Sequence, residues 1–225
     1  MKLVHSNFLV PIEFEENKII NLIIESPQIF NEYLGELYQQ VGCVEGRWVL
    51  SEKGELVQLE KFCEVIIDPY GLDINNRKII GKLYEEIKHA TISSELLLKW
   101  HQLYPAISRL LDELIDDFNF HLEYIDEIDI KDFLKFMNVR FVADNASLIE
   151  KVIDYMCLHH NIVGTKLFVL VNIKSFFTEE QLKYLHEQAL YQKFHLLLLE
   201  NHDSDVKNGL EKKYLIDKDS CVIYS

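Results

Sequence analysis

Two almost wholly apolar segments, residues 166–172 and 194–199, constrain the fold of this chain most. Neither shows the alternation of apolar and polar residues that a strand with one solvent-exposed face has, so we expect both to be strands that are buried on both faces of a sheet. Between them, Thr178-Glu179-Glu180-Gln181 has the pattern of a capping box and predicts a helix that runs to about Gln192. A strand, a helix and a second strand in this order predict a right-handed crossover between parallel strands, and therefore an α/β fold.

The N-terminal part of the chain has the pattern of short strands and one helix. Ser26-Pro27 begins the helix, because serine is a good N-cap and proline suits the first helical position. Ser51-Glu52-Lys53-Gly54 predicts the turn of a hairpin. The expected strands are residues 7–12, 18–24, 47–50, 55–59 and 65–67.

The middle of the chain changes to helical periodicity. Apolar side chains recur three and four residues apart over residues 75–88 and 93–120, and we expect Pro105 to kink or split the longer helix. A shorter helix is expected at residues 129–138. The remaining expected elements are a strand at 139–142, a helix at 144–158 capped by Asp144 or Asn145, and edge strands at 214–216 and 221–224.

The simplest architecture is an α/β domain made from both ends of the chain, residues 1–69 and 138–225. A helical domain, residues 70–137, is inserted between them. The N-terminal strands alone are too few to hold a stable core, so they need strands that come later in the chain.

Composition limits the class of protein. The chain of 225 residues has a net charge of −14, which taken alone disfavours nucleic-acid binding, because phosphate contacts need Lys and Arg. Net charge constrains only the far field, so a local basic surface can coexist with it, above all in an oligomer that pools its lysines.

No apolar run is long enough to cross a bilayer and no signal-peptide core begins the chain, so we expect a cytoplasmic protein. The four scattered cysteines, Cys43, Cys63, Cys157 and Cys221, predict neither zinc site nor disulfide framework.

The sequence lacks the common catalytic and phosphate-binding motifs. There is no G-x-x-x-x-G-K-[ST], G-x-G-x-x-G, G-x-S-x-G or H-E-x-x-H. His159 and His160 are adjacent and point in different directions on a helix, so a helix C-terminal surface is favoured over a shared ligand role. Asn172 and Glu200 follow the two apolar strands, where α/β sheets bind ligands, but without a phosphate loop we expect them simply to end those strands.

Residues 120–134 concentrate carboxylates. Mutual repulsion among them would be relieved by a hard cation, for which carboxylate oxygens are the preferred ligands. Plain helix capping is the alternative: Asp129 is a good N-cap, and Asp132 would lie in the first helical turn. Both interpretations stay open on the spacing alone. The carboxylates are Glu123, Asp126, Glu127, Asp129 and Asp132.

The order of segments resembles the Csn-two family, the DNA-end-binding subunit that marks type II-A CRISPR loci. Leu72-Asp73-Ile74-Asn75 leads into a helix, and residues 122–128 lead into residues 133–139. Residues 166–172, 177–180, 196–200 and 214–217 follow in that order. The resemblance runs from about Leu72 to Cys221, and its specificity lies in order, spacing and total length.

The resemblance implies a degenerate P-loop ATPase-like head domain and a helical leg domain. It implies a homotetrameric ring that threads double-stranded DNA ends without sequence preference and has no catalysis of its own. It implies work in spacer acquisition beside the CRISPR integrase and the type II effector nuclease. It also implies Ca²⁺ near the junction of head and leg.

Carried onto this sequence, the calcium ligands of that family fall on Glu123, Asp126, Glu127 and Asp132. Related proteins often have an acid where this chain has His121, which is a poor calcium ligand. One calcium site is therefore expected to be missing or rebuilt. The acids that could rebuild it are Asp116, Asp117 and Asp129.

The DNA-facing residues are predicted to be lysines and arginines in three places. The best cluster is Arg77-Lys78 with Lys82, because Lys78 and Lys82 are one helical turn apart. The other candidates are Arg47 and Lys53 in the hairpin, and Lys131, Lys135 and Arg140 near the junction. Contacts to phosphates alone are sufficient for binding without sequence preference.

Two other functions remain open on the sequence. The carboxylates from Glu123 to Asp132 could serve a metal-dependent nuclease, since two-metal chemistry also uses clustered acids. A protein-interaction module without DNA contact would agree with the net charge of −14.

Overall fold

The computed structural model of this chain describes residues 1–7, 11–116, 118, 120–125, 128–142, 147–203, 209–218 and, as backbone, 222–224. The chain divides into two compact units, Met1–Ile74 with Ala143–Ser225, and Asn75–Val142. The predicted limits of the helical insertion, 70 and 137, each lie five residues before the limits of the second unit. The fold is mixed α/β around a parallel sheet, as the apolar segments predict.

A six-stranded sheet organises the first unit, in the order β10-β9-β3-β8-β7-β6. All neighbours are parallel except β10, which runs antiparallel to β9. The prediction of an edge strand at 214–216 is wrong, because β9 pairs with β3 on one side and β10 on the other. The strands are β3 (Ile19–Ile24), β6 (Cys63–Ile66), β7 (Leu167–Val171), β8 (His195–Glu200), β9 (Glu211–Ile216) and β10 (Val222–Tyr224).

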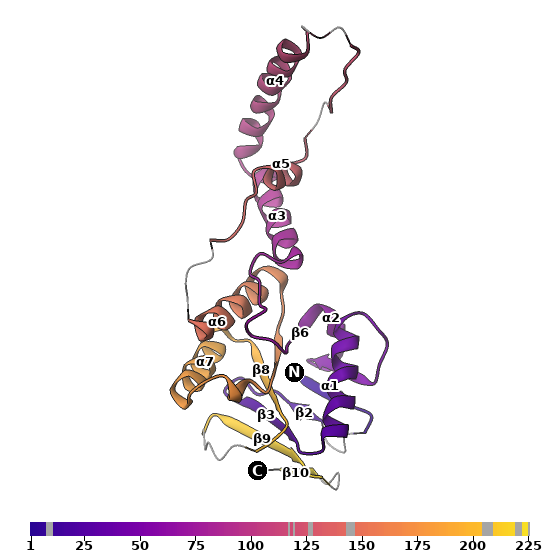
Figure 1. The fold of residues 1–225 in the computed structure, drawn as a ribbon, viewed down its shortest axis with the longest axis vertical. Helices are drawn as coiled ribbons and strands as arrows, with labels where there is room; N and C mark the ends of the chain where they lie inside the picture. The colour runs from indigo at the N-terminus through magenta and orange to yellow at the C-terminus, as the bar shows by residue number, and fades with distance from the viewer. Residues whose placement is uncertain are drawn as a thin grey trace. The chain divides into compact units, whose positions relative to one another are not determined.

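Helices α6 (Leu148–Leu158) and α7 (Glu179–Gln192) cover one face of this sheet (Figure 1). The predicted capping box starts α7: Thr178 N donates to Gln181 Oε1 at 3.0 Å, and Gln181 N donates to Thr178 Oγ1. The N-cap of α6 is Ser147, whose N–H donates to Glu150 Oε2 at 2.8 Å. The prediction of Asp144 or Asn145 as the cap is therefore wrong, and both residues lie outside the described ranges.

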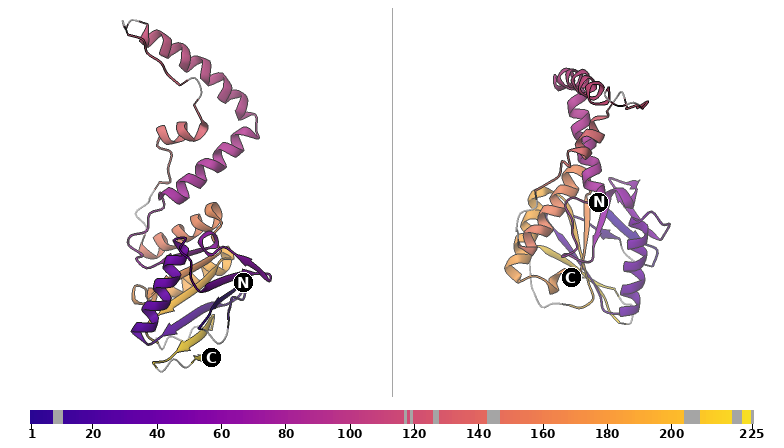
Figure 2. Two further views of the ribbon diagram at one scale, coloured as in Figure 1. Left: turned by 90° about the vertical axis from the view of Figure 1, so that its right-hand side faces the viewer. Right: turned by 45° about the horizontal axis from the view of Figure 1, so that its top comes forward.

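The opposite face of the sheet is covered by α1 (Pro27–Val41), α2 (Leu59–Phe62) and a second sheet (Figure 2). This antiparallel sheet has the order β2-β1-β4-β5, and the predicted hairpin turns at Lys53 and Gly54, whose φ values of 54° and 89° suit a two-residue hairpin loop. For the predicted strand at 7–12, the structure has β1 and β2 on either side, and residues 8–10 lie outside the described part. The strands are β1 (Lys2–His5), β2 (Ile12–Glu13), β4 (Trp48–Glu52) and β5 (Glu55–Val57).

The main apolar core lies between the six-stranded sheet and the layer formed by α1, α2 and the antiparallel sheet. Leu3, Leu37, Leu50, Val169 and Leu197, each at most 1% exposed, come from both sheets and from α1. Residues from the two ends of the chain thus share one core, which is why neither end is expected to fold alone.

The second unit contains α3 (Arg77–Ile92), α4 (Leu96–Ile115) and α5 (Ile130–Phe136). Pro105 lies inside α4 without splitting it. The predicted strand at 139–142 is wrong. Its backbone bonds to side chains instead of a neighbouring strand: Val139 O accepts from Tyr84 Oη at 2.7 Å, and Phe141 bonds to both side-chain atoms of Asn75. No helix of the described residues is both long and apolar enough to span a membrane.

Candidate nucleic-acid interface and metal ligands

The first turn and a half of α3 presents three cations to solvent. Asn76 caps the helix, its Oδ1 accepting from Lys78 N at 2.9 Å and Ile79 N at 3.1 Å. Ile79 is fully buried and fixes which side of the helix faces inward. The side chains of Arg77, Lys78 and Lys82 are all exposed, and Lys78 and Lys82 lie one helical turn apart. We call these three residues the α3 basic face.

The sequence around this face is locally basic. Residues 75–99 and 128–142 together carry eight Lys and Arg against five Asp and Glu. Residues 100–127 carry one against seven. The chain as a whole carries 23 Lys and Arg against 37 Asp and Glu. The part of the second unit that contains α3 and α5 thus has a positive excess within a strongly acidic chain.

The candidates in α5 and in the segment after it differ in their contacts. Lys131 Nζ binds Glu85 Oε1 at 2.6 Å, which raises the pKa of Lys131 and lowers that of Glu85. Lys88 pairs with Asp129, and together these contacts tie α5 to α3. Lys131 is therefore occupied within the protein, whereas Lys135 and Arg140 are exposed.

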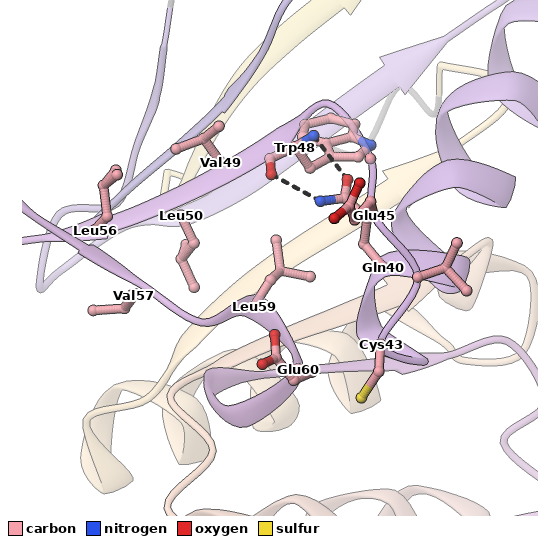
Figure 3. A pocket seen from close by; sticks show the side chains of 12 residues that line it. Gln40, Cys43, Glu45, Trp48, Val49, Leu50, Leu56, Val57, Leu59 and Glu60 are labelled. Atoms are coloured by element: carbon pink, nitrogen blue, oxygen red, sulfur yellow. Dashed lines mark hydrogen bonds between the residues drawn. The ribbon is translucent and has the colours of Figure 1, made fainter.

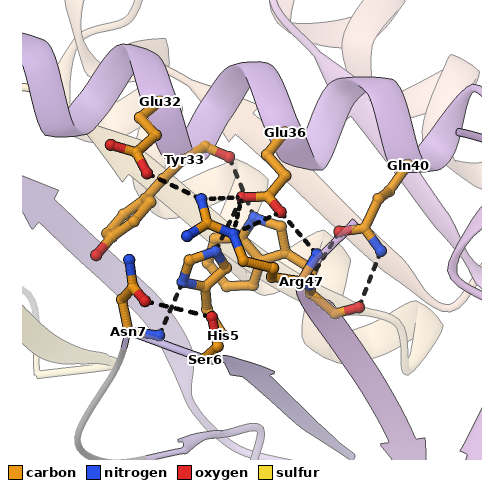
Figure 4. Close-up of polar contacts among 9 residues, drawn as sticks. His5, Ser6, Asn7, Glu32, Tyr33, Glu36, Gln40 and Arg47 are labelled. Carbon is orange, nitrogen blue, oxygen red and sulfur yellow. Dashed lines mark hydrogen bonds and ion pairs between the residues drawn. The ribbon is translucent and has the colours of Figure 1, made fainter. Parts of the chain in front are cut away.

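Arg47 is also occupied, although it is exposed. Its guanidinium donates from Nε and Nη2 to Glu36 and from Nη2 to Glu32 Oε1 at 2.8 Å (Figure 4). The bond from Arg47, with a further one from His5, lowers the pKa of Glu36 to about 2. A guanidinium held by two carboxylates has little charge left for a phosphate, so Lys53, exposed at the hairpin tip, is the better candidate in the first unit.

The predicted calcium ligands are only partly described. Glu123 and Asp132 are both exposed, and Asp126 and Glu127 lie outside the described residues. No three His, Cys, Asp or Glu residues of the described part come together as a metal-binding group. Asp129 accepts from Lys131 N at 2.8 Å and pairs with Lys88, so it acts as the helix cap of the alternative interpretation. The two described carboxylates have the chemistry of calcium ligands, but they do not form a ligand set by themselves.

Helix α4 is apolar along one side and yet none of its residues is buried. Its large apolar side chains recur at alternating intervals of four and three residues, the pattern of a seam between two helices. Leu110 is 56% exposed and Leu114 is 57% exposed. We call these residues the α4 seam: Leu96, Trp100, Leu103, Ile107, Leu110 and Leu114.

Comparison with known proteins decides the family. The family model described as CRISPR-associated protein (Cas_Csn2) matches residues 40–220, most of the chain. The chain belongs to the Csn2 family. It is also 23% identical to the CRISPR-associated protein Csn2 of Enterococcus faecalis over 215 residues, which cover 95% of this chain and 94% of that protein. The predicted resemblance is confirmed, and the chain is a CRISPR-associated protein.

In this Csn2 family member the polar residues at the strand ends have structural contacts. Asn172 N donates to Leu199 O, and its side-chain oxygen accepts from Asn201 N at 3.0 Å, so it joins the ends of β7 and β8.

His159 is buried, contrary to the prediction of a surface pair. It begins a π-helical turn (His159–Val163) and its ring lies 4.5 Å from that of Tyr155.

A groove of 480 Å³ lies in the first unit between β4, β5, α2 and the loop after α1 (Figure 3). Val49, Leu50 and Leu56 supply apolar walls, and Glu45 and Glu60 add carboxylates. Phosphate binding needs cations or a cradle of backbone N–H groups. This groove therefore does not have the chemistry of a DNA site.

Proposed function

We propose that this chain is a non-catalytic DNA-end-binding protein. It binds ends of double-stranded DNA without sequence preference, as a homotetrameric ring around the duplex. It acts in the cytoplasm in spacer acquisition of a type II-A CRISPR system, with the integrase and the effector nuclease, and so in antiviral defence. Membership of the Csn2 family supports the CRISPR role. The observation that carries DNA binding is the α3 basic face.

The α3 basic face gives a chain with a net charge of −14 a local surface that can bind DNA phosphates. Arg77 and Lys82 are exposed, and Lys78 is exposed although it also has a contact within its own chain. Four copies would bring twelve such cations together, and these attract phosphates at short range although the chain as a whole is acidic. None of the three is needed to read a base, which suits binding without sequence preference. Lys53, Lys135 and Arg140 are further candidates, whereas Arg47 and Lys131 serve internal ion pairs.

Self-association is supported by the α4 seam. Four leucines of the seam are exposed in one copy and favour a helix–helix contact, and a second copy offers the same seam; they are Leu96, Leu103, Leu110 and Leu114. Such a contact excludes water from leucines that are more than half exposed in one copy. We propose that the seam is one of the contacts that close the ring.

Calcium is proposed to bind Glu123 and Asp132 together with Asp126 and Glu127. Glu123, Asp126 and Glu127 lie within residues 100–127, where acids outnumber cations seven to one, and a hard cation would relieve their mutual repulsion. The binding would stabilise the helical unit by mass action.

Charge reversal of the α3 basic face tests the proposal. The triple variant Arg77→Glu, Lys78→Glu, Lys82→Glu is compared with a matched control, Lys61→Glu, Lys183→Glu, Lys218→Glu, which changes the charge equally at exposed positions of the first unit. Binding of a linear duplex is measured over a salt series. The slope of log affinity against log salt should become shallower by about 0.9 for each phosphate that the triple variant no longer neutralises, and should not change in the control. Equal affinity of the two variants would contradict the α3 assignment, and cleavage of the duplex with Mg²⁺ or Mn²⁺ would favour a nuclease.

A further inference from the structure

A buried polar cluster lies beneath α7, on the sheet face away from the main core. It contains Asn21 of β3, Glu200 of β8, Glu211 of β9 and His186 of α7. Lys174 joins it from η2 (Ile173–Ser175), the short turn before α7. Asn21, His186 and Glu200 are at most 3% exposed, and the side chains of Lys174 and Glu211 are 5% and 7% exposed. Neither DNA binding nor the main core uses these groups.

The cluster holds η2 by both its backbone and its side chain. Lys174 N donates to Glu200 Oε1 at 3.2 Å, while Lys174 Nζ binds Glu211 Oε2 at 2.7 Å. Asn21 Nδ2 donates to the same Glu211 oxygen at 2.9 Å. His186 Nε2 lies 3.8 Å from Glu211 Oε1, so α7 itself meets the same carboxylate. The segment from η2 to α7 is thus fastened to β3, β8 and β9 at one point.

Burial shifts the pKa values of two groups of the cluster in opposite directions. Burial raises the pKa of Glu200 to about 7, although Lys174 opposes the shift, and it lowers the pKa of His186 to about 4, although Glu211 opposes that one. The charged groups that act on both are Lys174 from η2 and Glu211 from β9. Of the other described groups nearby, Asn21 is neutral, and Lys213 of β9 pairs with Asp203.

Each group alone would make the docking of α7 depend on pH. If η2 and α7 lift away, Glu200 and His186 both reach water and regain ordinary pKa values. Rising pH then favours lifting through Glu200, which ionises in the open state and stays protonated in the docked state. Falling pH favours lifting through His186, which takes up a proton in the open state and stays neutral in the docked state.

We propose that Glu200 and His186 form a compensated clasp, which keeps the docking of the η2–α7 segment nearly independent of pH in the mildly acidic range. Lys174 and Glu211 form the ion pair of the clasp. Glu200 and His186 supply opposite proton dependences that cancel. The cancellation requires both side chains to be uncovered by the same opening. Glu200 accepts from the backbone of η2 and His186 belongs to α7, so both lose these contacts when the η2–α7 segment lifts away.

Hydrogen exchange of α7 amides at pH 5.5 and 6.5 tests the clasp, expressed as protection factors that remove the intrinsic pH dependence of exchange. Protection should change less than twofold in the wild type. In Glu200→Gln it should rise about fivefold with pH, and in His186→Phe it should fall about sevenfold. The double variant should again be nearly flat, and His186→Gln provides a second neutral replacement if phenylalanine does not fit.

The amides of α1, on the opposite face of the sheet, are the internal control and should not show these opposite slopes. Three results would overturn the proposal. The first is pH-independent protection in both single variants, and the second is slopes of the same sign in both. The third is equal slopes in α1 and α7, because the two groups would then report unfolding of the whole unit instead of a local clasp.

Discussion

Replacing Leu110 and Leu114 by aspartate should disrupt self-association through the α4 seam. The two leucines lie four residues apart on one side of α4 and are 56% and 57% exposed. Their exposure also means that the single copy loses little packing when they are changed. The variant therefore separates assembly from folding, which circular dichroism checks by the unchanged helix content.

The size of the effect follows from the exposed apolar surface. Complete burial of a leucine gives about 1.5–3 kcal/mol, so a leucine that is still half exposed has about 1 kcal/mol to gain. Two leucines in each of two facing copies then give about 4 kcal/mol. At 1.4 kcal/mol for each factor of ten, the double variant should associate about a thousandfold more weakly.

Sedimentation velocity over a dilution series measures this difference. The matched control is Leu98→Asp with Gln102→Asp, which has the same spacing and the same added charge but lies on the side of α4 away from the seam. Wild type and control should sediment as the same assembly, and the seam variant should dissociate. If the seam variant and the control have equal association constants, then α4 is not an assembly contact.

Four further predictions concern the Arg47–Glu36 pair, the calcium ligands and the α7 cap. Arg47→Ala should leave DNA affinity unchanged, which titration of a duplex checks. Glu36→Gln should remove the part of the folding stability that the wild type has above pH 4.5 and loses as the pH falls towards 2, which urea unfolding over a pH series checks. Calcium should raise the melting temperature of the wild type and fail to do so in Glu123→Gln, Asp132→Asn; an equal rise in both would exclude these ligands. Thr178→Ala should lower the free energy of unfolding by about 1 kcal/mol because it removes the α7 cap, and no change would show that the cap is replaced by solvent.

The parallel sheet could be predicted because its strands are buried on both faces. Residues 166–172 and 194–199 show no alternation of apolar and polar side chains, which is typical of strands buried on both faces. They form the adjacent strands β7 and β8. The segment 139–142 shows the limit of the same argument. It has strand-like composition, but a strand needs a partner, and the partners of this segment are the side chains of Tyr84 and Asn75.

The candidate interface was predictable where it depends on spacing within one helix. Lys78 and Lys82 lie one turn apart, so their position on the same side of α3 follows from helical geometry, whereas their exposure is seen only in the structure. The state of Arg47 was not predictable, because its partner Glu36 comes from another element, eleven residues earlier in the chain. The cluster of Lys174, His186 and Glu211 was missed for the same reason: strands and helices far apart in sequence bring these polar residues together.

A comparison of two DNA substrates tests the central claim most directly. A linear duplex and a covalently closed circle of the same sequence are incubated with the protein, with calcium and with chelator, and then washed at a salt concentration that removes weak phosphate contacts. A ring that threads DNA ends should be retained on the linear duplex and not on the closed circle. Equal retention on both would show that the protein binds the duplex from the side, and the ring would have to be abandoned.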